Sequence, residues 1–117
     1  MTKIQIVHNP RCSKSRQTLQ LLEEKGYKPQ IIEYLKNPLS ADELKIIISQ
    51  LGFDSARELL RSKEDDYKAL NLADKNLSDD AIIDAMLSHP KLIERPIVIA
   101  NNKARIGRPP EAVLDIL

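Results

Sequence analysis

The first 34 residues read as a strand, a helix and a second strand, and this order constrains the fold more than any other feature. Lys3–Val7 alternates polar and apolar residues and is rich in β-branched side chains, which is typical of a strand. A helix is predicted to begin near Cys12–Ser13 and to end at Lys25, because Gly26 supplies the glycine that commonly follows a helix. Gln30–Tyr34 is the next predicted strand. A strand–helix–strand unit of this length fits a crossover between parallel strands, so we expect an α/β fold.

The middle of the chain is predicted to be helical from its capping signals and apolar spacing. Ser40 and Glu43 form a capping box ahead of Leu44–Leu51, where the apolar residues recur at helical spacing. Ser55 and Glu58 repeat the capping box and predict a short third helix. A polar stretch follows through Asn76, with no helix expected. A fourth helix is then predicted to begin at Ser78–Asp80 and to end at His89, because Pro90 follows.

The C-terminal part of the chain returns to strands. Ile97–Ala100 reads as a buried strand, and Asn101-Asn102 suits the positive φ angles of a tight hairpin turn into Ala104–Ile106. Pro109-Pro110 then opens a last helix. The chain is therefore predicted to be a single domain over residues 1–117, ordered βαβ, a helical insertion at about 40–93, and ββα.

Composition and charge exclude several classes of protein. The net charge is +1, from 18 basic and 17 acidic residues, so no overall field attracts nucleic acid or an anionic membrane. No apolar run approaches the ~18 residues of a membrane span, and no signal peptide is recognisable, so the cytoplasm is the expected location. The single cysteine excludes an internal disulfide framework, and with only two histidines beside it no zinc site of the usual Cys/His kind is expected.

Cys12 is the main candidate for chemistry. It falls where the first strand gives way to a helix, a position at which open α/β sheets place their ligands. The free N–H groups and the dipole of a helix N-terminus favour an anion, and Arg11, Lys14 and Arg16 add positive charge. A thiol in this position is expected to have a pKa below about 8.5 and to react as a thiolate. The alternative is a buried structural thiol, and the basic surroundings favour the reactive one.

Two neighbours of Cys12 have candidate supporting roles. His8 either hydrogen-bonds the loop or the sulfur, or it is a strand-end histidine satisfied by the backbone. Ser15 stands where a C-x-x-C pair would carry its second cysteine, or it caps a backbone group in the first helical turn. In either case the chain has an attacking thiol and no resolving one, so a second thiol must come from another molecule.

Three arginines are candidates for oxyanion binding, because a guanidinium group matches an oxyanion with two parallel hydrogen bonds. Arg95 and Arg108 bracket the predicted hairpin, and Arg61 ends the short third helix. Each of them alone is also consistent with a solvated surface charge. Arg57 and Arg105 are assigned no role and serve as controls of the same residue type.

Several segments together resemble the glutaredoxin-coupled arsenate reductase family. These segments are His8–Arg16, Leu59–Arg61, His89–Val98, and Gly107–Pro109 with Glu111. The resemblance covers nearly the whole chain, in order and with similar spacing. It implies a thioredoxin-like fold, an α/β sandwich in which a helical insertion separates the βαβ and ββα halves.

The resemblance also implies roles for individual residues. Cys12 falls on the position of the family's nucleophile, and Arg61, Arg95 and Arg108 fall on those of its oxyanion-binding arginines. Pro96 falls on a proline that the family places beside the nucleophile with a cis peptide bond. His8 and Ser15, as considered above, are the supporting residues beside this set.

The implied activity is that of an oxidoreductase that reduces arsenate to arsenite in arsenic detoxification. Glutathione is the implied co-substrate and glutaredoxin the implied partner, with no bound cofactor and a monomer expected. Two alternatives stay open at this point: a thioredoxin-like regulatory module that docks on RNA polymerase, and a general glutathione-linked thiol exchanger. Arsenate turnover distinguishes the enzyme from both.

Overall fold

The computed structural model describes residues 3–117, which divide into two compact units. The first unit combines the chain up to Asn37 with Arg95–Leu117, and the second is Pro38–Glu94. The second unit nearly coincides with the helical insertion predicted at about 40–93. The single-domain organisation stays a prediction.

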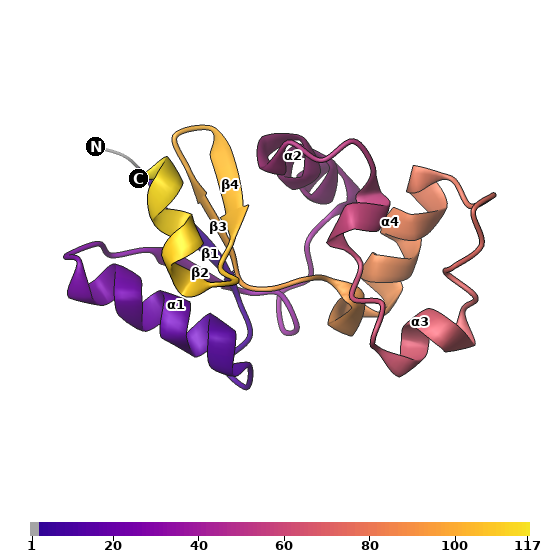
Figure 1. The fold of residues 1–117 in the computed structure, drawn as a ribbon, viewed down its shortest axis with the longest axis horizontal. Helices are drawn as coiled ribbons and strands as arrows, with labels where there is room; N and C mark the ends of the chain where they lie inside the picture. The colour runs from indigo at the N-terminus through magenta and orange to yellow at the C-terminus, as the bar shows by residue number, and fades with distance from the viewer. Residues whose placement is uncertain (1–2) are drawn as a thin grey trace. The chain divides into compact units, whose positions relative to one another are not determined.

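The first unit is built on a four-stranded mixed sheet (Figure 1). A parallel crossover is formed by β1 (Gln5–His8), α1 (Ser13–Glu24) and β2 (Gln30–Glu33). β3 (Ile97–Ala100) runs antiparallel to β1, and β4 (Lys103–Ile106) runs antiparallel to β3. The strand order across the sheet is β2-β1-β3-β4. The βαβ and ββα halves predicted from the sequence therefore share one sheet.

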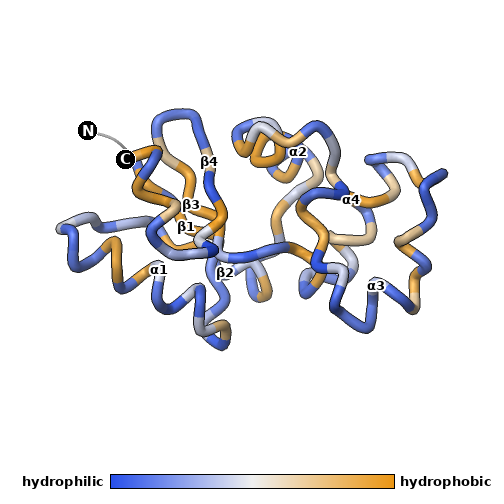
Figure 2. Tube along the Cα trace, viewed as in Figure 1, coloured by the Kyte–Doolittle hydropathy of each residue, from blue (hydrophilic) through white to orange (hydrophobic). Residues whose placement is uncertain are grey.

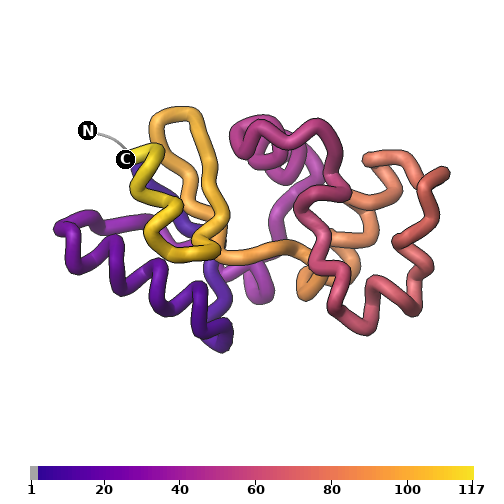
Figure 3. Tube along the Cα trace, viewed as in Figure 1, coloured from indigo at the N-terminus to yellow at the C-terminus, as the bar shows by residue number. Residues whose placement is uncertain are grey.

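The core of the first unit lies between the sheet, α1 and the 3₁₀ helix η3 (Pro110–Ile116). Figure 3 shows the first and last segments of the chain side by side in this unit, with η3 next to the sheet and α1. The buried apolar residues of this core are Ile4, Ile6, Leu22, Val98, Ala100, Val113 and Ile116. The last helix was predicted correctly in position, but it is 3₁₀ throughout.

The buried face of α1 carries more polar than apolar side chains. Its fully buried residues are Ser15, Thr18 and Leu22, which are spaced three and four apart as one helix face requires. Figure 2 shows hydrophilic and hydrophobic positions alternating along α1. Two of the three buried side chains are polar, so this helix face has a role besides hydrophobic packing.

The second unit consists of short helices. They are α2 (Ala41–Leu51), η1 (Ala56–Leu59), α3 (Asp65–Ala69), α4 (Asp79–Ser88) and η2 (Pro90–Leu92). α4 packs against α2, η1 and η2, and a single β-bridge joins the residues that follow η1 and η2. No helix within residues 3–117 is long and apolar enough to cross a membrane.

Both predicted capping boxes are present. Ser40 Oγ accepts from the Glu43 N–H at 3.1 Å, and Glu43 Oε1 accepts from the Ser40 N–H at 3.0 Å. Ser55 and Glu58 make the second box, and the short helix that it starts is 3₁₀. Local hydrogen bonds therefore set where these two helices begin.

The polar stretch before Asn76, in which the sequence predicted no helix, contains α3. α3 has no buried residue, so the apolar periodicity that reveals a helix is absent from its sequence. His8 is the last residue of β1, one position beyond the predicted end of the first strand.

Candidate functional site

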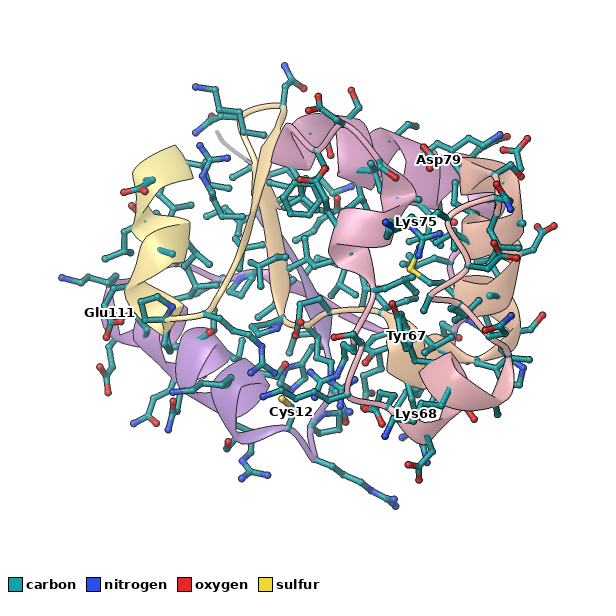
Figure 4. All side chains as sticks on the ribbon, turned by 45° about the vertical axis from the view of Figure 1, so that its right-hand side comes forward. Cys12, Tyr67, Lys68, Lys75, Asp79 and Glu111 are labelled. Carbon is teal, nitrogen blue, oxygen red and sulfur yellow. The ribbon has the colours of Figure 1, made fainter. Side chains whose placement is uncertain are left out.

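Cys12 occupies the N-cap position of α1, with an extended backbone at φ −92° and ψ 123°. Figure 4 shows the sulfur at the point where the loop joins the helix. The loop is held by Asn9, whose carbonyl accepts from the Cys12 N–H at 3.0 Å. Its Oδ1 also accepts from the Arg11 N–H at 3.0 Å. An N-cap side chain lies next to the free N–H groups of the first turn, and in this chain that side chain is a thiol.

The pKa of the Cys12 thiol lies below its ordinary value. Partial burial raises this pKa, but hydrogen bonds to the thiolate outweigh the effect. The largest favourable contribution comes from the backbone N–H of Ser15, followed by the side chain of Arg95 and its charge, and then the backbone N–H of Lys14. The helix N-terminus and one distant arginine thus favour the reactive thiolate.

Two of the three predicted arginines meet at the sulfur. Arg108 Nη2 donates to Cys12 Sγ at 3.6 Å, and Arg108 Nε donates to the backbone oxygen of Arg95 at 2.9 Å. Ile97 pairs with Ile106 in the β3–β4 register, so the residues flanking this pair emerge together at one end of the hairpin. The β3–β4 hairpin therefore places Arg95 and Arg108 next to the start of α1.

The positive charge at the sulfur has a different origin from the one expected. We expected it from the side chains of Arg11, Lys14 and Arg16, which flank the cysteine. Lys14 acts through its backbone N–H, and the charge that lowers the pKa belongs to Arg95. Arg16 instead donates from Nη1 to the Pro10 carbonyl at 3.0 Å and holds the loop.

Ser15 and His8 form a buried pair beneath the cysteine loop. Ser15 is 0% exposed, and its Oγ accepts from the Asn9 N–H at 3.0 Å. The same Oγ lies 2.6 Å from His8 Nδ1, a hydrogen bond in which the hydroxyl donates when that nitrogen carries no proton. Burial lowers the pKa of His8 and Arg16 lowers it further, whereas Glu33 acts in the opposite direction. His8 is therefore neutral at pH 7 and fixes Ser15.

Pro96 is buried at the start of β3, and the Arg95–Pro96 peptide bond is cis, which confirms the prediction. The Arg108–Pro109 bond is also cis, which we did not predict. The carbonyl of Pro96 accepts from the Gly107 N–H at 2.9 Å. This hydrogen bond joins Pro96, which follows Arg95, to Gly107, which precedes Arg108.

Arg61 belongs to the second unit and is held there by two carboxylates. Its Nε lies 3.3 Å from Glu64 Oε1, and its Nη1 lies 3.0 Å from Glu94 Oε1. The Arg61 N–H also donates to the Leu92 carbonyl at 2.8 Å. Participation of Arg61 in an oxyanion site with Cys12 stays a prediction.

The two control arginines, Arg57 and Arg105, differ in their hydrogen-bond partners. Arg105 donates from Nη1 to the carbonyl of the preceding residue, Ala104, at 2.8 Å. Arg57 donates to the carbonyl of Leu72 and, at 2.8 Å, to that of Asp74. Arg57 therefore ties the segment between α3 and α4 to η1, so only Arg105 is a suitable control for the site.

Comparison with known proteins gives the same fold and the same family. The sequence matches the ArsC family over residues 7–116. YfgD, an uncharacterized protein of Escherichia coli strain K12, is 60% identical over 118 residues, which cover 100% of this chain and 99% of that protein. An arsenate reductase of Neisseria meningitidis serogroup A is 50% identical over 117 residues, covering 100% of both chains.

A solved structure, an arsenate reductase from Vibrio cholerae, superposes with a TM-score of 0.97 at 57% identity. The superposition covers 99% of this chain and 98% of the other. The predicted thioredoxin-like sandwich with a helical insertion is confirmed. Since family, relatives and fold agree over nearly the whole length, the chain belongs to the ArsC family.

Proposed function

We propose that this protein is an arsenate reductase that uses Cys12 as nucleophile and takes electrons from glutathione and glutaredoxin. The observation that carries the proposal is the convergence of Arg95 and Arg108 on a thiol whose pKa is lowered at a helix N-terminus. This arrangement holds an anionic nucleophile beside two cations that also attract an oxyanion. The arsenate reductases among the relatives support arsenate as that oxyanion.

In the first step the Cys12 thiolate attacks the arsenic atom, and one arsenate oxygen leaves as water after taking up protons. Both reactants are anions, so they repel each other unless positive charge lies between them. Arg95 and Arg108 supply this charge from fixed positions, which also stabilises the charge that develops on the arsenate oxygens. The product of this step is a cysteine-bound arsenic(V) adduct.

Arg61 is the third proposed arsenate-binding arginine. It binds two carboxylates through Nε and Nη1, and we assign arsenate binding to its Nη2. The carboxylates of Glu64 and Glu94 hold the guanidinium in one orientation, which lowers the entropy cost of binding an oxyanion. In the proposed complex Nη2 donates to an arsenate oxygen.

Two thiols from outside the chain then reduce the arsenic. Glutathione attacks the adduct and displaces a second water, which leaves arsenic(V) bonded to both sulfurs. The glutaredoxin thiolate attacks the glutathione sulfur, so a glutaredoxin–glutathione disulfide forms and two electrons reduce arsenic to the +3 state. Hydrolysis of the Cys12–arsenic bond releases arsenite and restores the thiol.

The single cysteine of the chain supports the need for external thiols. Ser15 occupies the position of a resolving thiol. Its hydroxyl is fully buried and forms hydrogen bonds with Asn9 and His8. Glutathione acts here as a co-substrate, with no bound cofactor proposed. Such chemistry fits a reducing compartment, and we propose the cytoplasm.

The test is arsenite formation by the purified protein with each reductant supplied separately. Glutathione with glutaredoxin is expected to support many turnovers, whereas thioredoxin alone is not, because this chain presents no internal disulfide for it to reduce. Cys12→Ser is the blank, and mass spectrometry after exposure to arsenate and glutathione reads the adduct on Cys12. Sustained turnover with thioredoxin alone, or activity in Cys12→Ser, contradicts the mechanism.

The same preparation distinguishes the two alternative functions. A general thiol exchanger accelerates glutathione exchange with disulfides but produces no arsenite. A regulatory module co-purifies with RNA polymerase and is unaffected by Cys12→Ser. Arsenite production that depends on Cys12 excludes both as the main function.

A further inference from the structure

We propose that Gly107 is a positioning residue, whose close contact with Thr18 sets how near Arg95 and Arg108 lie to Cys12. Of the two measurements that test this inference, only the KM for arsenate depends on the proposed function. Its second readout, the pKa of Cys12, is independent of the substrate.

Gly107 lies where two parts of the first unit approach more closely than side chains allow. It is buried, and a Cβ atom built on it would overlap Thr18 Oγ1 and lie 2.9 Å from Pro96 Cγ and 3.1 Å from Thr18 Cγ2. Its φ is not in the left-handed region, so backbone conformation does not require glycine here. The close approach of α1 to the end of β4 is what requires it.

Thr18 cannot avoid an added Cβ by changing its rotamer. It is 0% exposed on α1, and its Oγ1 donates to the Lys14 carbonyl at 2.8 Å. Both of its γ atoms lie toward Gly107. Its two γ atoms occupy two of three staggered positions about χ1, so every rotamer leaves at least one of them facing residue 107. An added methyl group at residue 107 must therefore move the backbone.

This contact bears directly on the two arginines. The Gly107 N–H donates to the Pro96 carbonyl at 2.9 Å, so the residue after Arg95 and the residue before Arg108 move as one. On the other side of the contact, Thr18 belongs to the helix that Cys12 caps. The Gly107–Thr18 distance thus fixes the position of both guanidinium groups relative to the sulfur, including the 3.6 Å contact from Arg108.

The inference predicts that Gly107→Ala pushes the arginines away from Cys12. The thiolate then loses hydrogen-bond and charge stabilisation, so the pKa of Cys12 rises. The KM for arsenate also rises, by about tenfold or more, because a displacement near 1 Å at a binding group has effects of this order. The Thr18→Ala/Gly107→Ala double variant removes both γ atoms and restores both properties toward wild type. The remaining contact, with Pro96 Cγ, is relieved by a small change in ring pucker.

The experiment measures thiolate absorbance against pH and arsenate kinetics in four proteins. These are the wild type, Gly107→Ala, the double variant, and Val113→Ala as a control. Val113 lies in the core of the same unit, so Val113→Ala tests whether loss of stability alone changes either readout. Circular dichroism confirms that each protein is folded.

A raised Cys12 pKa and arsenate KM in Gly107→Ala, both recovered in the double variant, support the inference. If Gly107→Ala fails to fold, a folded double variant with near-wild-type values supports it equally. Wild-type values in Gly107→Ala, a double variant no better than the single one, or an equal effect from Val113→Ala each overturn it. A double variant that does not fold also overturns it, since Thr18 would not be the obstacle. If no protein reduces arsenate, the proposed function fails while the pKa comparison still decides the inference.

Discussion

The guanidinium of Arg108 donates to the sulfur of Cys12 across 3.6 Å, although 96 positions separate the two residues in the sequence. The contact joins the end of the C-terminal hairpin to the start of the first helix. The group that stabilises the nucleophile is thereby also placed to bind the anion that the nucleophile attacks. The pKa of the thiol and the affinity for the oxyanion are therefore expected to change together.

Replacing either site arginine is expected to reduce arsenate turnover. Arg95→Ala and Arg108→Ala each remove charge-assisted hydrogen bonds worth about 1.5–3 kcal/mol, which is a roughly ten- to hundredfold loss in kcat/KM. Steady-state kinetics measures the loss. Arg105→Ala is the matched control, because Arg105 bonds only its neighbour's carbonyl in the hydrogen bonds we describe. Equal losses in Arg105→Ala would mean that overall charge, and not the site, is responsible.

Arg61→Ala is expected to raise the KM for arsenate by a similar factor, since Arg61 is the third proposed binding arginine. Its carboxylate partners allow a further comparison. Glu94→Gln removes the charge beside Arg61 Nη1 but leaves an amide of the same shape, so it is expected to keep or lower the KM. A purely structural role for Arg61 predicts instead that Arg61→Ala loses stability without a change in the KM of the folded protein.

The absorbance of the Cys12 thiolate is expected to have its midpoint below the ordinary value of about 8.5. Arg95→Ala should raise the midpoint, because the Arg95 side chain and charge lower this pKa in the wild type. A wild-type midpoint at or above the ordinary value would show that the helix N-terminus is not aimed at the sulfur.

The same pKa shift predicts a pH dependence of stability. Because the folded pKa of Cys12 is lower than the unfolded one, the thiolate's contribution is fully present above the unfolded pKa. It is lost as the pH falls through the folded pKa. The Tm of the wild type relative to Cys12→Ser is therefore expected to rise with pH across this window. A constant difference would contradict the prediction.

His8 is expected to make the fold sensitive to acid. Its pKa is lowered mainly by burial, so its contribution to stability is present above about pH 6.5 and is lost as the pH falls through the folded pKa. Urea unfolding at pH 7.5 and 5.5 measures the difference. His8→Gln should flatten this dependence, and an unchanged dependence in this variant would contradict the prediction.

Arg57→Ala is expected to lower the free energy of unfolding by about 2 kcal/mol, because it leaves the carbonyls of Leu72 and Asp74 without a charged donor. Thermal unfolding is the measurement, with Arg105→Ala again as the comparison. The kcat of the folded fraction should be unchanged, which separates this stabilising arginine from those of the site.

The elements that could be predicted from the sequence are those set by local chemistry. Ser40 and Ser55 cap their helices through neighbours three residues away, and Asn101 and Asn102 adopt the positive φ values of the hairpin turn, 55° and 62°. α3 escaped prediction because no side chain of this helix is buried. A helix that begins with a capping box is recognisable from its capping residues. A short helix without buried residues, such as α3, has no apolar periodicity by which to recognise it.

The site was predictable in its residues but not in its connections. Cys12 was recognisable from its position before a helix, whereas its contact with Arg108 depends on the β3–β4 register and the packing of η3. Flanking cations were expected to lower the pKa of the thiol, and a distant arginine does so. Gly107 belonged to a segment that carries the family resemblance, but its steric role could not be predicted, because that role depends on the opposing residue, Thr18.

The buried hydroxyl of Ser15 limits how this protein can evolve. A change of Ser15 to cysteine would recreate a C-x-x-C pair and, on paper, a self-sufficient redox enzyme. A thiol is larger than a hydroxyl and a weaker donor and acceptor, so it would leave Asn9 and His8 poorly bonded in a space with no exposed surface. The arrangement that keeps the Cys12 loop in place therefore also keeps the chain dependent on thiols supplied by other molecules.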